Sequence, residues 1–307
     1  MGYIGFTERG KYVTWSDATT QFLESRQERS AAVRTLQAYG EDLAVFAGWH
    51  QRERGVGVHE LGDVTPLTLA RYREWLASRC KPATVNRRLS ALRSLFAWAT
   101  SEGHLAQTPA GHLRPMAQVA LGPRALDRDK VARLVDAAGR RSRRDAVLIT
   151  LLAQTGLRIS EALALTWGHV QVGKDAGMII VERGKGAKYR EVPLNATARR
   201  ALLVWRGLRW PDGTKPPEPV FPSRTGRALA RRTAEELFVR YSRAAGIDPP
   251  ATPHVLRHTF CKALVDAGES LDRVAALAGH ARLDTTALYT RPTRADLERA
   301  VGRLDQP

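Results

Sequence analysis

The chain has little cysteine, no long apolar run and a shortage of acidic residues. Its two cysteines, Cys80 and Cys261, lie far apart and have no partner cysteines at metal-site spacing, which argues against a disulfide framework and a cysteine zinc site. No apolar stretch reaches the length that spans a bilayer, and the first residues lack the apolar core of a signal peptide. We therefore expect a cytoplasmic protein whose cysteines are reduced packing residues.

The shortage of acidic residues leaves the chain strongly basic. Asp and Glu number 31 against 48 Lys and Arg, a formal net charge of +17. Such an excess favours a polyanionic partner, because cationic side chains displace the counterions condensed on nucleic acid. A membrane surface is the weaker alternative, since the basic residues are spread over many segments instead of forming one polybasic helix. The length of 307 residues predicts two domains.

The first domain, residues 1–106, is predicted to be all-helical, with four or more helices. Apolar residues recur at helical spacing through its last helix, within residues 81–104. Polar and basic side chains cover the rest of that helix: Asn86, Arg87, Arg88 and Arg93. We predict that this helix lies along DNA; the alternative is a solvated basic face on an ordinary core helix.

Residues 107–125 contain three prolines and no sustained helical period, which predicts a linker. In the second domain, residues 126–307, the pattern predicts a buried helix before Gly156 and a new helix after it. Residues 177–194 change to strand character around a glycine-rich turn, so we expect a β-hairpin with Lys185 at its tip. The predicted fold is mainly α with a small β-hairpin or sheet.

The most informative stretch is residues 251–292. His254 and Arg257 are three residues apart and should project from one face of a helix. His280 follows Gly279, where a second helix should end. Tyr289 should lie on a short element that Pro292 terminates.

These residue types fit phosphate chemistry. Two arginines, Arg158 and Arg257, can hold the non-bridging oxygens of one phosphodiester and spread the charge that grows in the transition state. The oxygen of Tyr289 can act as the nucleophile, while Lys185 and a histidine exchange the protons. Taken alone, each of these residues could equally be an ordinary surface, capping or packing residue. The chemistry requires no metal.

The main alternative interpretation of the histidines is a metal site. His254 and His258 are four residues apart, as metal-binding pairs on helices are. A zinc hydrolase also needs a glutamate beside the first histidine and a third ligand. Val255 and Arg257 stand near the pair instead, and the arginine would repel a cation. We predict no bound metal.

Five motifs in order carry a family resemblance: TGLRISEALAL, RGKGAKYREVPL, HVLRHTF, LAGH and TTALYT. Together they resemble the tyrosine recombinases, the lambda-integrase-like site-specific recombinases, and are most similar in layout to the Xer-type bacterial members. The resemblance covers most of the chain. It implies a SAM-like helical core-binding domain over 1–106, a linker over 107–125, and an α+β catalytic domain with a C-terminal tail helix over 126–307.

The resemblance also implies roles for single residues. The catalytic set would be Arg158, Lys185, His254, Arg257, His280 and Tyr289. Glu161 and His258 would support this set, and Lys188 competes with Lys185 for the hairpin role. Tyr289 would attack double-stranded DNA at a specific core site to give a 3′-phosphotyrosine. In the family this occurs in a synaptic homotetramer, proceeds through a Holliday junction, and uses neither metal nor nucleotide cofactor.

Two other functions stay open at this point: a type IB-like topoisomerase, and a DNA-binding protein that lacks catalysis. Within the recombinases, dimer resolution and mobile-element integration or excision both fit. The sequence does not specify the target site, the participation of a second recombinase, or whether the tail packs on its own subunit or on a neighbour.

Overall fold

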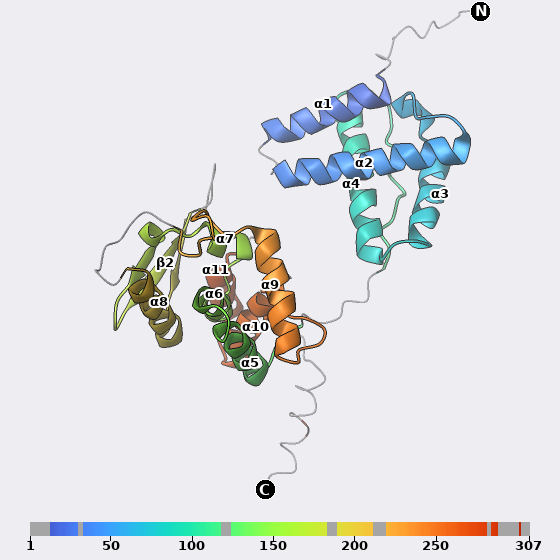
Figure 1. The fold of residues 1–307 in the computed structure, drawn as a ribbon. Coiled ribbons are helices and arrows are strands. Elements are labelled where there is room, and N and C mark those ends of the chain that lie inside the picture. Colours follow the sequence, from blue (N-terminus) through green and yellow to red (C-terminus); the bar gives the residue numbers. More distant parts are fainter. Residues whose placement is uncertain are drawn as a thin grey trace, which may run out of the picture. The chain divides into compact units, whose positions relative to one another are not determined.

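The computed structural model describes residues 13–29, 33–117, 124–182, 189–210, 219–280, 284–287 and 301. The chain divides into two compact units, Met1–Ala120 and Leu121–Pro307 (Figure 1). The domain limits at residues 106 and 126 stay a prediction.

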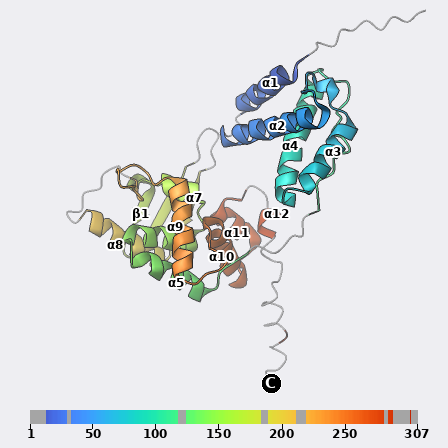
Figure 2. The ribbon, with the colours of Figure 1, turned by 45° about the vertical axis from the view of Figure 1, so that its right-hand side comes forward.

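The first unit is helical throughout its regular elements. These are α1 (Trp15–Glu28), α2 (Val33–Arg54), a 3-10 turn (Leu61–Asp63), α3 (Pro66–Ala77) and α4 (Pro82–Ser101). Thr65 caps α3 by accepting a hydrogen bond from the Thr68 amide, and Pro66 fits the first turn because its missing amide needs no partner there. α4 contacts the other three helices (Figure 2). The rings of Phe46 and Tyr72 meet edge to face in the core, with centroids 4.9 Å apart.

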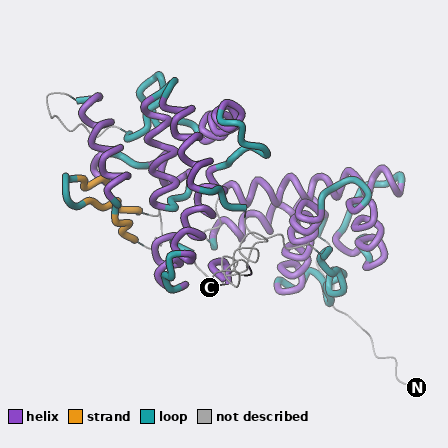
Figure 3. Tube along the Cα trace, turned by 90° about the horizontal axis from the view of Figure 1, so that it is seen from below, coloured by secondary structure: helices purple, strands orange, loops and turns teal. Residues whose placement is uncertain are grey.

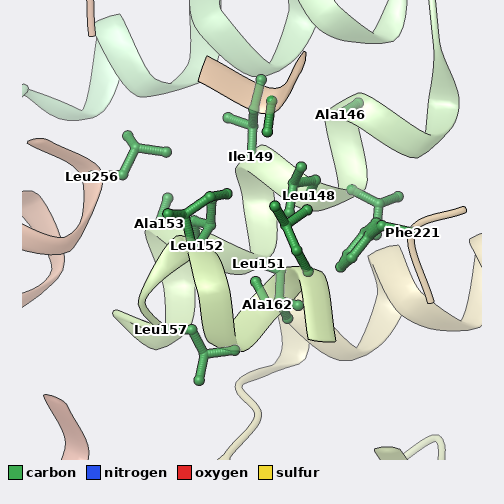
Figure 4. Packing of buried hydrophobic residues seen from close by; sticks show 14 of the residues in the cluster. Ala146, Leu148, Ile149, Leu151, Leu152, Ala153, Leu157, Ala162, Phe221 and Leu256 are labelled. Atoms are coloured by element: carbon green, nitrogen blue, oxygen red, sulfur yellow. The ribbon is translucent and has the colours of Figure 1, made fainter. Parts of the chain in front are cut away.

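The second unit is built around one buried helix. Its helices are α5 (Arg128–Gly139), α6 (Arg143–Thr155), α7 (Ile159–Ala164), α8 (Ala196–Arg209), α9 (Arg231–Ala244), α10 (Pro253–Asp266), α11 (Leu271–Ala278) and α12 (Asp284–Ala287), with a 3-10 turn at Trp167–His169. α6 is apolar around nearly its whole circumference, and it contacts α5, α8 and α10. Figure 4 shows Leu256 of α10 and Phe221 on either side of its leucines.

A three-stranded antiparallel sheet lies at one edge of this unit (Figure 3). Its strands are β1 (Val170–Val172), β2 (Gly177–Val181) and β3 (Arg190–Pro193). Ile179 pairs with Val170 on one side and with Val192 on the other. The hairpin strands β2 and β3 were predicted; β1 was not, because three residues are too short to show an alternating pattern. The predicted fold class, mainly α with a small sheet, is confirmed.

Candidate active site

The site is centred on the turn between α6 and α7. Gly156 ends α6 in the left-handed conformation, with φ of 63°, a geometry that glycine adopts without the steric cost of a side chain. Its carbonyl oxygen accepts a hydrogen bond of 2.7 Å from Nη1 of Arg257, whose exposed fraction is only 4%. Arg158 follows two residues later as the N-cap of α7. One turn therefore links the two arginines that sequence analysis proposed for phosphate binding.

Arg158 is held by its own helix and by the end of α11. Its Nη1 donates to Oε1 of Glu161 at 2.9 Å, and its backbone amide donates to Oε2 of the same carboxylate at 2.8 Å. Its Nη2 donates to the carbonyl oxygen of Gly279 at 2.7 Å. The side chain keeps 35% of its surface exposed, so the guanidinium can still reach a ligand.

Glu161 has a second arginine partner that sequence analysis missed. Arg190, the first residue of β3, donates from Nη1 to Oε1 at 3.0 Å and from Nη2 to Oε2 at 2.7 Å. Burial raises the pKa of Glu161, but hydrogen bonds from Arg190 and from the Arg158 amide outweigh it and lower the pKa to about 2. A signal was present: Arg190 and Val192 share one face of a strand, and a basic side chain on an inward face needs a carboxylate.

α10 supplies two histidines beside Arg257. Thr252 caps the helix and Pro253 occupies its first turn. The rings of His254 and His258 touch edge to face, with centroids 4.1 Å apart. Burial and the nearby Arg257 and Arg158 lower the pKa of His254. Burial, His254 and Arg257 lower the pKa of His258 to about 4.

His280 enters the site at the C-terminus of α11. Gly279 caps this helix with φ of 66°, and His280 follows it. Burial, Arg257 and Arg158, in that order, lower the pKa of His280 to about 4, so its ring is neutral at pH 7. Its Nδ1 lies 2.8 Å from Oγ1 of Thr286, a fully buried side chain of α12. Sequence analysis did not identify this contact.

These contacts gather Arg158, Arg257, His254, His258 and His280 around one place, where the arginine charges help to lower the pKa values of the three histidines. Two guanidinium groups beside neutral imidazoles suit an anionic ligand, and above all a phosphoryl group that gains charge in the transition state. In the part of the chain that the structure describes, no three His, Cys, Asp or Glu side chains gather to hold a metal ion.

Comparison with known proteins decides the family. Residues 124–295 match the Phage integrase family, and residues 20–103 match the Phage integrase, N-terminal SAM-like domain. Tyrosine recombinase XerD of Caulobacter vibrioides is 39% identical over 289 residues, which cover 90% of this chain and 91% of the relative. The chain belongs to the phage integrase family of tyrosine recombinases. It is an enzyme that cleaves and rejoins DNA, a site-specific recombinase.

One further relative and two solved structures of similar fold accompany this match. Tyrosine recombinase XerC of Xanthomonas campestris pv. campestris is 34% identical over 278 residues, which cover 89% of this chain and 83% of the relative. The fold is similar to XerH recombinase bound to a palindromic difH substrate, with a TM-score of 0.74, 22% identity and coverage of 94% and 86% of the two chains. It is also similar to a lambda integrase tetramer bound to a Holliday junction, with a TM-score of 0.72, 19% identity and coverage of 92% and 80%.

Two residues of the predicted recombinase site lie outside the described residues. Lys185 falls within 183–188, as does its competitor Lys188, and Tyr289 falls within 288–300. The described elements end close to both, since β3 begins at Arg190 and α12 ends at Ala287. The roles of Lys185 and Tyr289 stay predictions.

The predicted DNA-binding residues of α4 all have partners inside their own unit. Asn86 exchanges two hydrogen bonds with the backbone of Met116, at 3.0 and 2.7 Å. The remaining contacts are Arg87 to Asp42 at 2.6 Å, Arg88 to Asp42 at 3.6 Å, and Arg93 to the Leu89 carbonyl at 3.4 Å. Arg87 keeps 48% of its side chain exposed, so of these four residues it is the one best placed to contact a ligand as well.

Among the described residues, no helix combines the length and the apolar composition that crossing a membrane requires.

Proposed function

We propose that this recombinase cuts double-stranded DNA at specific core sites through a covalent 3′-phosphotyrosine formed by Tyr289. The observation that carries the proposal is the convergence of Arg158, Arg257, His254 and His280 around one place, with the histidines held neutral. A phosphodiester brings the negative charge that this group of side chains is arranged to meet.

The proposed reaction is a transesterification. The Tyr289 oxygen attacks phosphorus and the bond from phosphorus to the 5′ oxygen breaks, so the number of phosphoester bonds is conserved and no energy source is needed. His254, which is neutral at pH 7, accepts the phenol proton, and Lys185 gives a proton to the leaving 5′ oxygen. Arg158 and Arg257 hold the non-bridging oxygens, His280 hydrogen-bonds the phosphate, and Glu161 and His258 support them.

The proposal extends to how the protein assembles on DNA. Residues 1–106 and 126–307 act as core-binding and catalytic domains on one DNA duplex, and the basic face of α4 contributes phosphate contacts. Four copies form the synapse, alone or with a second recombinase, and exchange strands through a Holliday junction. A lambda integrase tetramer of similar fold, bound to such a junction, supports this arrangement. The protein acts in the cytoplasm, in dimer resolution or in mobile-element integration and excision.

A covalent-capture experiment tests the proposal. The protein is incubated with supercoiled plasmids carrying fragments of the source genome, and the products are run on denaturing gels with and without protease. We expect a DNA-linked protein band that Tyr289→Phe abolishes while DNA affinity persists, because only the nucleophilic oxygen is lost. Sequencing the junctions gives the target site and the biological role.

Two outcomes contradict this function. Covalent capture by Tyr289→Phe equal to wild type would remove Tyr289 from the mechanism. Relaxation of every plasmid irrespective of its insert would indicate a topoisomerase. Metal dependence is checked in parallel: we expect EDTA to leave cleavage unchanged, and inhibition reversed by zinc would revive a site at His254 and His258.

A further inference from the structure

Arg190 contacts Glu161 in the active site, and the proposed reaction gives it no role in binding the phosphate or in moving a proton. Its side chain is 11% exposed and meets Glu161 with two parallel hydrogen bonds of 3.0 and 2.7 Å. Such a two-pronged pair fixes direction as well as distance, because the planar guanidinium matches the plane of the carboxylate. Glu161 is itself only 10% exposed, so solvent screens this pair little.

The other edge of Arg190 meets the end of α11. Its Nε donates to the carbonyl oxygen of Leu277 at 3.3 Å. Its guanidinium also lies directly against Gly279: a β-carbon there would be 2.8 Å from Nη1 and 2.9 Å from Cζ. The carbonyl oxygen of Gly279 accepts the hydrogen bond from Arg158, and His280 is the next residue. Arg190 therefore touches both groups that hold the guanidinium of Arg158.

The charges give Arg190 a second effect on Arg158. Glu161 contacts both arginines and carries one negative charge at neutral pH, since its pKa is about 2. With Arg190 bound to both carboxylate oxygens, the three groups have a net charge of about +1, which is available to an anionic ligand. Without Arg190, the carboxylate would neutralise Arg158 and draw it into a two-pronged pair of its own. Arg158 would then turn away from Gly279.

We propose that Arg190 is a positioning residue for DNA cleavage: by holding Glu161 and packing on Gly279, it aims Arg158 at the scissile phosphate. The inference rests on the proposed role of Arg158 as a phosphate ligand. Arg190 is also the first residue of β3, the strand that follows the segment containing Lys185. Its contacts with Glu161 and Gly279 therefore connect the start of β3 to the phosphate site.

The first test compares cleavage by Arg190→Gln with cleavage by wild type on the duplex recovered by covalent capture. We expect the single-turnover rate to fall about 100-fold, the cost of misplacing a catalytic group by about 1 Å, with DNA affinity nearly unchanged. Arg190→Lys keeps the charge but cannot donate two parallel hydrogen bonds to Glu161, so it should recover only part of the rate. Cleavage by Arg190→Gln at the wild-type rate would overturn the proposal.

A neutral substrate separates positioning from general damage. A methylphosphonate at the scissile position lacks one anionic oxygen, so it depends less on the charge of Arg158. The deficit of Arg190→Gln relative to wild type should shrink on this substrate, as should that of Arg158→Ala. An equal deficit on both substrates would show that Arg190 does not act through Arg158.

Arg144→Gln is the matched control. Arg144 also pairs with a buried carboxylate, Asp145, and donates to a carbonyl oxygen, that of Pro222; neither of these partners belongs to the proposed active site. Its loss should lower thermal stability while leaving the cleavage rate per folded molecule unchanged. A rate loss equal to that of Arg190→Gln would assign both effects to folding.

A measurement without DNA keeps the inference separate from the proposed function. NMR of arginine-labelled protein detects guanidinium protons whose rotation is restricted by hydrogen bonds, and the signals of Arg158 are assigned by their absence in Arg158→Lys. We expect Arg190→Gln to broaden them and Arg144→Gln to leave them sharp. Sharp Arg158 signals in Arg190→Gln would overturn the inference, whereas absence of cleavage by wild type would count against the proposed function.

Discussion

The ring of Phe260 occupies the space that a side chain on Gly156 would need. A β-carbon on Gly156 would lie 2.8 Å from Cε1 of that ring and closer still to Cδ1. Gly156 also has φ of 63° and accepts the hydrogen bond from Arg257. The approach of α10 to the end of α6 therefore depends on a residue without a side chain, two positions before Arg158.

Gly156→Ala should destabilise the second unit and lower cleavage. The left-handed conformation costs a non-glycine residue about 1–2 kcal/mol. Pushing Phe260 aside adds about 1–3 kcal/mol and moves Arg257 with α10. Urea unfolding measures the sum. Gly268→Ala is the control, because Gly268 has φ of 87° with no atom within 4 Å of an added β-carbon. Equal losses in the two variants would show that the Phe260 contact costs nothing.

Thr286→Val should slow DNA cleavage without weakening DNA binding. The change keeps the shape of a buried side chain but removes the hydroxyl 2.8 Å from Nδ1 of His280. A lost hydrogen bond of about 1 kcal/mol corresponds to a roughly fivefold to tenfold slower rate. The tautomer of His280, read by nitrogen-detected NMR of the imidazole, should change as well. Thr286→Ser should restore both values; wild-type cleavage with an unchanged tautomer in Thr286→Val would remove Thr286 from the mechanism.

The stability of the second unit should fall between about pH 6.5 and pH 4. The pKa values of His258 and His280 are about 4 in the folded protein against an ordinary value of 6.5. Below pH 6.5 the unfolded chain therefore binds protons that the folded chain does not, so the free energy of unfolding decreases as the pH falls. Calorimetry at pH 8 and pH 5 measures the loss.

A histidine variant identifies the source of this pH dependence. His258→Gln removes one of the three rings whose pKa is lowered and should reduce the difference between pH 8 and pH 5. His112→Gln, at an exposed histidine of the first unit, should leave the transition of the second unit as it is in wild type. A second unit equally stable at both pH values in the wild-type protein would contradict the low pKa values.

Local motifs brought out the residues proposed to bear the chemistry, but not the residues that hold them in place. Arg158, His254, Arg257 and His280 were identified from local motifs, and the structure brings them together. Arg190 was missed because its partners, Glu161 and Gly279, lie on other elements far away in the chain. Only tertiary packing decides which carboxylate a buried arginine meets.

The contacts of the basic face of α4 were likewise not predictable from the local sequence. Its polar and basic side chains are evident from the sequence, and helical spacing correctly separated them from the apolar core. The partners that fix them, Asp42 on α2 and the backbone of Met116, come from segments that no local pattern connects to α4. Sequence reasoning identified a charged surface but not its internal contacts.

Asp42 anchors this basic face, and Asp42→Asn should destabilise the first unit. The carboxylate is 2% exposed and meets Arg87 and Arg88. Burial raises its pKa, and the two arginines partly offset that effect. Removing its charge leaves Arg88, 20% exposed, without its acidic partner, at a cost of about 1–3 kcal/mol, because relief of the buried carboxylate charge offsets part of the loss. Arg87→Ala should cost less than about 1 kcal/mol, since nearly half of Arg87 is in solvent. Calorimetry of the first unit compares the two.

Arg87→Ala should weaken DNA binding although it costs the first unit little stability. Arg87 can turn from Asp42 to a phosphate because its guanidinium is accessible, and a lost phosphate contact lowers the slope of log affinity against log salt by about 1. We therefore expect Arg87→Ala to weaken binding and reduce the slope, whereas Arg71→Ala, at an exposed arginine on α3, leaves the slope unchanged. Equal slopes for Arg87→Ala and wild type would mean that Arg87 only pairs with Asp42, and that the basic face of α4 is a solvated surface.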